Sequence, residues 1–137
     1  MRRVGAMIGL DTNVLVRYIM QDDVEQSRQA ALLVESLTVE APGFVTLVSV
    51  IELTWVLTSC FSLSRLQVAS ALEGLIRSKE IVVERSEIVW QAVRVFRDGT
   101  ADFADCLIER SAASAGCERT MTFDRGAAKS CGMTLIQ

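Results

Sequence analysis

The feature that most constrains the fold is a carboxylate at the end of an apolar run near the N-terminus. The apolar run 6–10 ends at Asp11, and a new apolar pattern begins after Thr12 and Asn13. This pattern is typical of a buried parallel strand that leads directly into a helix. Ligands of open α/β sheets bind outside the carboxyl ends of the strands, so Asp11 is placed to face a binding site. Asp is also a preferred helix N-cap, and this stretch alone favours both roles about equally.

Strand patterns alternate with helix patterns along the rest of the chain. Further strands are predicted at 44–46, 81–83, 120–123 and 134–136, and helices at 13–20, 24–37, 48–60, 65–78, 86–97 and 102–115, with a helical turn after the fourth strand. The helix at 48–60 is apolar on nearly every side, which predicts that it is well buried. The alternation predicts an α/β fold with a parallel sheet covered on both faces.

Several helix ends carry recognisable signals. Asp22 and Asp23 are placed to cap the second helix, and the segment 64–67 fits a capping box because Ser64 is followed three residues later by Gln67. Ser86 is a candidate cap for the helix at 86–97. Gly116 is placed to end the helix that begins near residue 102.

Length and charge limit the classes of protein. A chain of 137 residues predicts one domain, 1–137, and a net charge of −3 argues against a generally basic nucleic-acid binder. The longest apolar runs are too short to span a bilayer. The N-terminus has Arg2 and Arg3 but no continuous apolar segment that would form a signal peptide. We therefore expect a cytoplasmic protein that does not bind a membrane.

The chain contains no histidine, which excludes Ser-His-Asp, Cys-His and histidine acid–base chemistry. The four cysteines form no C-x-x-C pair, so a structural zinc site is not expected, and we interpret all four as buried reduced thiols. They are Cys60, Cys106, Cys117 and Cys131. An enzyme of this composition has to use carboxylates, Lys, Tyr, Cys or a metal held by oxygen ligands.

Acidic residues stand at the positions where a parallel sheet would present a site. Asp11 and Asp124 each follow a predicted strand, so we expect both at the same edge of one sheet. Glu52 lies in the most apolar helix, where a carboxylate is rarely buried without a partner. A surface position for Glu52 stays an alternative.

Asp102 and Asp105 are three residues apart in a predicted helix and therefore share one face. The same face continues to Glu109, which we expect to be exposed to solvent. For Asp102, a favourable interaction with the helix dipole is as good an interpretation as a chemical role.

Four converging carboxylates would need a compensating charge. At separations of about 6 Å and an effective dielectric of about 20, each pair repels by roughly 2.8 kcal/mol, and the six pairs together by about 17 kcal/mol. A whole domain is stable by only about 5–15 kcal/mol. Carboxylate oxygens are the ligands that Mg²⁺ or Mn²⁺ prefers, and such an ion can activate water for phosphodiester hydrolysis.

Four segments together resemble the acidic motifs of PIN-domain ribonucleases, and most of all those of the VapC toxins of bacterial toxin–antitoxin pairs. The segments are Leu10-Asp11-Thr12-Asn13-Val14-Leu15, Ile51-Glu52-Leu53, Ala101-Asp102-Phe103-Ala104-Asp105 and Thr122-Phe123-Asp124-Arg125. They occur in the family's order and at compatible spacings over essentially the whole chain. Asp-Thr-Asn alone is a weak motif, whereas the four together are specific.

The resemblance implies roles for individual residues. The catalytic acids that hold the metal would be Asp11, Glu52, Asp105 and Asp124. Asp102 would be an auxiliary acid, and Thr12, Asn13 and Thr122 would be supporting polar residues. The resemblance also implies a three-layer α/β/α sandwich with a central, mainly parallel sheet, Mg²⁺ or Mn²⁺ as cofactor, RNA as substrate, and a homodimer neutralised by a cognate, VapB-like antitoxin.

Three other classes of protein were weighed against this one. A phospho-receiver domain needs adjacent acids after its first strand and a Lys after its last, but Asp11 stands alone and Lys129 lies in a predicted helical turn. A haloacid-dehalogenase phosphatase needs Asp-x-Asp, and here the second position is Asn13. A binding module that keeps the fold without catalysis is the remaining alternative, and the complete set of acids argues against it.

Overall fold

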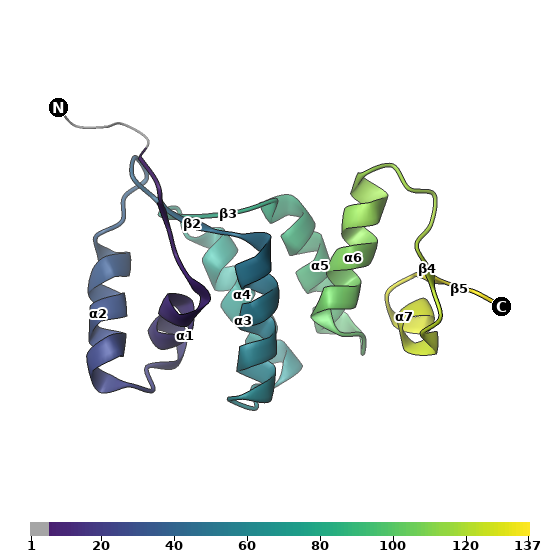
Figure 1. The fold of residues 1–137 in the computed structure, drawn as a ribbon, viewed down its shortest axis with the longest axis horizontal. Coiled ribbons are helices and arrows are strands. Elements are labelled where there is room, and N and C mark those ends of the chain that lie inside the picture. The colour runs from purple at the N-terminus through teal and green to yellow at the C-terminus, as the bar shows by residue number, and fades with distance from the viewer. Residues whose placement is uncertain (1–5) are drawn as a thin grey trace.

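The computed structural model describes residues 6–137, and this part of the chain contains seven helices and five short strands (Figure 1). The strands are β1 (Ile8–Gly9), β2 (Gly43–Val45), β3 (Ile81–Val83), β4 (Met121–Thr122) and β5 (Thr134–Leu135). The helices are α1 (Thr12–Met20), α2 (Val24–Glu35), α3 (Leu47–Ser59), α4 (Arg65–Arg77), α5 (Ser86–Asp98), α6 (Phe103–Ser114) and α7 (Arg125–Ser130). Every predicted element is present, with ends that differ by a few residues.

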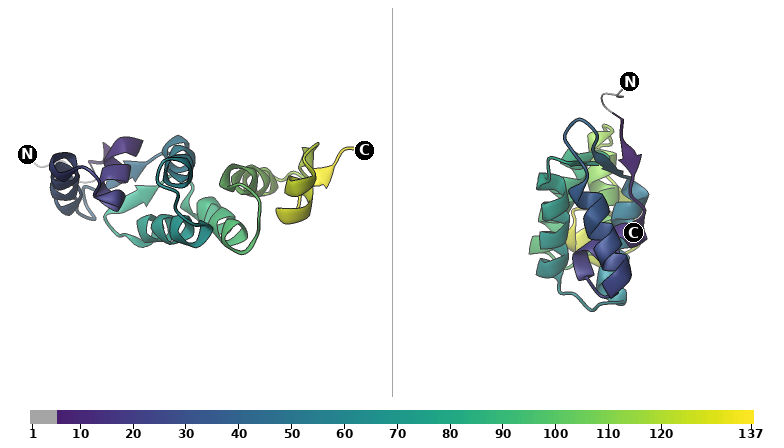
Figure 2. Two further views of the ribbon diagram at one scale, coloured as in Figure 1. Left: turned by 90° about the horizontal axis from the view of Figure 1, so that it is seen from below. Right: turned by 90° about the vertical axis from the view of Figure 1, so that its left-hand side faces the viewer.

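The strands form two separate parallel sheets. One has the order β1-β2-β3, and the other consists of β4 and β5. In Figure 2 (left), α1 and α3 lie on one side of the three-stranded sheet and α4 lies on the other. This confirms the predicted α/β class, the parallel pairing and the layered arrangement. The molecule is elongated, and the β4–β5 pair lies at the end opposite to α1 and α2 (Figure 1).

Most helix ends follow the signals in the sequence. Asp23 caps α2, and the capping box at the start of α4 has both of its hydrogen bonds. Gly116 follows α6 with φ of 96°, a left-handed conformation that suits glycine. The prediction that Ser86 caps α5 was wrong, because Ser86 is already the first helical residue. The cap position belongs to Arg85, which has φ of 52° and makes no capping hydrogen bond through its side chain.

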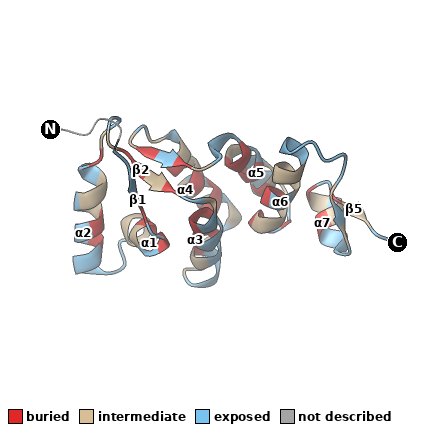
Figure 3. Cartoon of the chain, turned by 45° about the horizontal axis from the view of Figure 1, so that its top comes forward, coloured by how far each residue is buried: buried red, intermediate tan, exposed pale blue. Residues whose placement is uncertain are grey.

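The core runs through both halves of the molecule. Leu15, Val45 and Leu53 are fully buried against the three-stranded sheet, and Cys106 of α6 is fully buried near the other end. Figure 3 shows that buried residues gather where helices face each other or the strands. None of the helices within residues 6–137 is both long and apolar enough to cross a membrane.

Two expectations about burial were wrong. Helix α3 is buried on one side only, because Val48, Ile51 and Trp55 share a face that is exposed in the part of the chain that the structure describes, and Trp55 is 63% exposed. Among the cysteines, all four are free, but Cys60 and Cys117 are exposed. Both exposed cysteines lie just beyond helix ends, where the chain turns away from the core.

Candidate functional site

Asp11 and Glu52 line one open pocket of about 610 Å³, together with Thr12 and Asn13. Asp11 follows β1 and stands at the N-cap of α1, and its Oδ1 accepts a hydrogen bond of 2.7 Å from the Thr12 backbone N–H. Asp11 therefore does cap α1, and this cap engages only one of its two carboxylate oxygens, Oδ1. The side chain of Asp11 is exposed to solvent. Glu52, which lines the same pocket, is also exposed, on the surface of α3. Glu52 therefore occupies a surface position, which was the alternative interpretation of this residue.

Thr12, which also lines this pocket, has a buried hydroxyl group without a hydrogen-bond partner in the described part of the chain. It is only 5% exposed, and its Oγ1 has no hydrogen-bond partner within residues 6–137. A buried hydroxyl without a partner costs free energy, which native proteins seldom leave uncompensated. Thr12 therefore has an unused donor and acceptor directly beside Asp11.

A second group of acids lies around the start of α6. Asp102 stands at its N-cap without a capping hydrogen bond from its side chain, and Asp105 lies in its first turn. Partial burial raises the pKa of the Asp105 carboxyl, and the nearby charges of Asp102 and Asp124 raise it further. Asp102 and Asp124 are therefore both close enough to Asp105 to repel its negative charge, and Asp102 and Asp105 lie within one turn of α6, as their spacing in the sequence predicted.

Thr122 positions the third member of this group. The backbone N–H of Asp124 donates to Thr122 Oγ1 at 3.0 Å, and Asp124 Oδ1 accepts from the backbone N–H groups of Gly126 and Ala127. Asp124 thus caps α7 through the backbone N–H groups two and three residues later, whereas Asp11 accepts from the N–H of the next residue only. The second carboxylate oxygen of each is not used by its cap.

The expectation that Glu109 is exposed to solvent was wrong. Its side chain is 14% exposed and forms an ion pair with Arg110, with Oε1 2.6 Å from Nε. Burial raises the pKa of the Cys131 thiol, at the end of α7, more than any other cause does. The negative charges of Asp105 and Glu109 raise it further. Glu109 is one turn after Asp105, and the charges of both therefore act on the same thiol. The i, i+4 spacing was the signal in the sequence that they share this environment.

The two groups of acids do not meet within one chain. Asp11 follows β1 and Asp124 follows β4, which belong to different sheets, so the expected common sheet edge is not formed. Within residues 6–137, no three Asp, Glu or Cys side chains lie close enough together to hold one metal ion. The carboxylate ligands suit Mg²⁺ or Mn²⁺ chemically, but their placement in a single copy does not fit such an ion.

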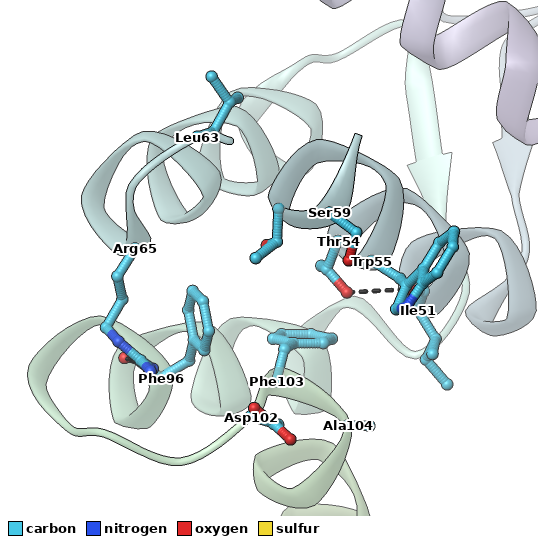
Figure 4. Close-up of a pocket in the computed structure, with 11 residues that line it drawn as sticks. Ile51, Thr54, Trp55, Ser59, Leu63, Arg65, Phe96, Asp102, Phe103 and Ala104 are labelled. Atoms are coloured by element: carbon cyan, nitrogen blue, oxygen red, sulfur yellow. Dashed lines mark hydrogen bonds between the residues drawn. The ribbon is translucent and has the colours of Figure 1, made fainter. Parts of the chain in front are cut away.

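A pocket of about 470 Å³ lies between α3 and the start of α6 (Figure 4). Trp55 and Asp102 line it from opposite sides. Arg65 stacks on the Phe96 ring at 4.4 Å, and its Nη1 donates to the carbonyl oxygens of Phe96 and Ala101 at 2.9 and 2.7 Å. The guanidinium group of Arg65 thus connects the end of α5 with the loop before α6. No motif in the sequence pointed to this role.

The comparisons with known proteins agree with the resemblance at the level of the family. The PIN domain family matches residues 8–132, which include every acid described above. A search of curated proteins finds no match to this chain. PIN domains are in general nucleases and usually use divalent metal ions. Because the match covers nearly the whole chain, this protein belongs to the PIN domain family.

Proposed function

We propose that this PIN domain is a metal-dependent endoribonuclease and the toxin of a type II toxin–antitoxin pair. The observation that carries the proposal is the family match over residues 8–132, within which the four VapC-like acidic motifs stand in order. The exposed positions of Asp11, Glu52 and Asp124 support it, because acids that a nuclease uses have to be accessible to a polymer. The proposed site acids are Asp11, Glu52, Asp105 and Asp124, with Asp102 as an auxiliary acid.

The chemistry of these side chains also supports a cation. Carboxylates repel a phosphodiester, so an acidic surface binds RNA only when positive charge stands between the two. Mg²⁺ or Mn²⁺ would supply that charge, activate water and stabilise the transition state. Thr12, Asn13 and Thr122 would orient the acids, as Thr122 already orients the Asp124 backbone.

The acidic surface also favours a basic inhibitor. A cognate, VapB-like antitoxin would cover the acids with an extended segment and place an Arg or Lys side chain among them, as a charge-assisted hydrogen bond requires. Co-expression with the product of a small neighbouring gene should abolish growth inhibition and yield a stable complex. Growth inhibition that persists while the folded neighbour is present would contradict the toxin–antitoxin part of the proposal.

Substitution of two acids tests the nuclease itself. Asp11→Asn keeps the helix cap, because Asn caps about as well as Asp, and Asp105→Asn removes one charge from the other group. Both variants should fold, and both should lose RNA cleavage and growth inhibition by orders of magnitude. Cleavage of a defined RNA is followed on gels in Mg²⁺ and in Mn²⁺. Glu118→Gln is the matched control, because Glu118 is exposed and lies outside the acidic motifs.

The two acids should act as one unit. The double variant should be scarcely less active than either single variant, since removal of one member of a catalytic unit already removes its function. An Asp11→Asn protein that cleaves RNA at the parental rate, free of contaminating nuclease, would overturn the proposed role of these acids. Parental protein that binds RNA but never cleaves it would favour the non-catalytic binding module.

A further inference from the structure

The first observation concerns the unpaired edge of β1. The backbone N–H of Ile8 donates to the carbonyl oxygen of Pro42, just before β2, at 3.1 Å, and the N–H of Leu10 donates to that of Phe44 in β2 at 2.9 Å. Since successive residues of a strand direct their backbone groups to opposite sides, the N–H and C=O of Gly9 point to the other side, where none of the strands within residues 6–137 pairs with β1. Ile8 is 45% exposed although it belongs to a parallel strand. Parallel strands normally lie inside a sheet, and a free edge is a template for another strand.

Strand β4 has a matching free edge. Thr120 and Thr122 accept hydrogen bonds from β5 through their carbonyl oxygens, at 2.8 Å each. The backbone groups of Met121, which lies between them, therefore point away from β5. Met121 is exposed, and Phe123 at the end of the strand is 80% exposed. Each sheet thus ends in a strand of two residues with one unused edge.

Uncovered apolar side chains lie next to both edges. On the β1 side they are Met7, Ile8, and the α3 face of Val48, Ile51 and Trp55. On the β4 side they are Ile108 of α6, Met121 and Phe123. An exposed apolar helix face such as that of α3 marks a site of association. Ile51 and Trp55 of this face line the pocket that Asp102 also lines, and Glu52 of the same helix lines the pocket of Asp11.

The chain itself holds its two ends apart. Arg65 of α4 donates to the carbonyl oxygen of Phe96 in α5 and to that of Ala101 just before α6. Ser130 of α7 accepts hydrogen bonds from the backbone N–H groups of Thr100 and Ala101, at 2.8 and 3.0 Å. The β4–β5 unit is therefore fastened through α7 to the loop before α6, and this loop is fastened to α4. With these bonds in place, the β4–β5 pair lies at the end of the molecule opposite to α1 and α2 (Figure 1), and a second copy can present its β4 to β1 while it keeps all of them.

We propose that two copies of this chain exchange strands, so that β1 of each copy pairs in parallel with β4 of the other. Each candidate site then combines Asp11 and Glu52 of one copy with Asp102, Asp105 and Asp124 of its partner, and the dimer contains two such sites. The exchange joins the two sheets into one and covers the apolar faces of α3 and α6. This inference rests on the proposed function, because it states how the same acids come together.

Complementation between two inactive variants tests the shared site. One copy carries Asp11→Asn and the other Asp105→Asn, and the mixed dimer is isolated through two different tags. With exchange, one site of the mixed dimer holds both substitutions and the other holds neither. The mixed dimer should therefore recover about half of the parental RNA cleavage, since an isologous dimer has two equivalent sites. Each variant alone should stay inactive, and a mixed dimer of parental and Glu118→Gln chains should be fully active.

A cross-link reads out the strand exchange without relying on activity. Cys60→Ser and Cys117→Ser remove the exposed thiols, while the buried Cys106 and Cys131 stay in place. Ile8→Cys is introduced in one chain and Met121→Cys in another, and a short bismaleimide bridges neighbouring strands, which lie about 5 Å apart. The mixture should give a covalent dimer of one chain of each kind. Neither variant alone should give one.

A chain that carries both Ile8→Cys and Met121→Cys distinguishes exchange from closure. Exchange predicts covalent dimers, as seen on denaturing gels. Covalent rings within single chains, or no cross-link at all, would overturn the proposal, and so would a mixed dimer as inactive as its parents while the parental dimer cleaves RNA. If the parental protein cleaves no RNA, the proposed function fails, and the cross-link alone still decides the exchange.

Discussion

Asp105 is the residue whose environment bears most directly on stability. Burial raises its pKa above the ordinary 3.8, and Asp102 and Asp124 add to the effect. The folded protein therefore binds the proton of Asp105 more tightly than the unfolded chain does. The stability that this proton contributes is complete below about pH 3.8 and is lost as the pH rises through the pKa of the folded state. Without a cation, the ionised carboxylate thus opposes folding at neutral pH.

Asp105→Asn should accordingly raise the free energy of unfolding near pH 7 in metal-free buffer, because the amide carries no charge and cannot repel its neighbours. The gain should shrink as the pH falls through the raised pKa of Asp105, because the carboxyl of the parent then also becomes neutral. Urea unfolding at several pH values measures this difference. Glu118→Gln should show no such pH-dependent gain. An Asp105→Asn variant less stable than the parent near pH 7 would show that the carboxylate makes a stabilising contact instead.

Among the elements, β1 belongs to the three-stranded sheet and also positions Asp11 of the candidate site. Its inner edge binds β2, and its outer edge is free. Its last residue leads into Leu10 and then Asp11, so any strand that pairs with the outer edge also approaches Asp11. Pairing at this edge is therefore coupled to the geometry of the acids.

Gly9→Pro tests this coupling. Proline removes the one N–H that points to the free edge and leaves the hydrogen bonds of Ile8 and Leu10 to Pro42 and Phe44 in place. The variant should keep its helical content and yet lose both dimerisation and RNA cleavage, as measured by light scattering and by gel assay. Gly9→Ala is the matched control, because a Cβ at this position meets open space. Unchanged dimers of the Gly9→Pro variant would show that the β1 edge is not used.

At the scale of the whole molecule, the fold of one copy keeps the two groups of acidic side chains apart. The chain has a net charge of −3, and its two groups of acids lie apart in one copy. Any assembly that brings them together has to overcome their repulsion, which at about 6 Å and an effective dielectric of about 20 is roughly 2.8 kcal/mol for each pair of acids. A divalent cation that binds only the assembled form would favour that form by mass action.

Mn²⁺ should therefore shift the equilibrium from monomer toward dimer and raise the thermal midpoint. Both effects should be larger near pH 7.5 than near pH 5, where protons begin to compete for the carboxylates. Sedimentation and thermal unfolding measure the two shifts, with NaCl of equal ionic strength as the reference. The Asp11→Asn variant should respond less. A sedimentation profile and a midpoint that Mn²⁺ leaves unchanged at both pH values would contradict a cation bound between the two groups of acids.

The local features of this protein could be predicted from its sequence, because they depend on neighbours a few residues apart. Apolar periodicity predicted the alternation of strands and helices, and Asp11, Ser64 and Gly116 marked helix ends correctly. Ser86 failed as a cap because the left-handed conformation of Arg85 starts α5 one residue earlier than the capping pattern implies. The acidic motifs, in their order, predicted the family that the match over residues 8–132 confirms.

The contacts between distant segments were decided only by the tertiary structure. Hydrogen-bond groups at a strand edge are the same for every residue, so no local pattern says which strand joins β1, and the structure leaves that edge free. For the same reason the sequence overestimated the burial of α3, whose apolar face is exposed within residues 6–137, and misjudged Glu109, whose side chain is 14% exposed and paired with Arg110. Asp11 and Asp124 are more than a hundred residues apart, and whether they meet depends on the pairing of whole sheets rather than on either motif.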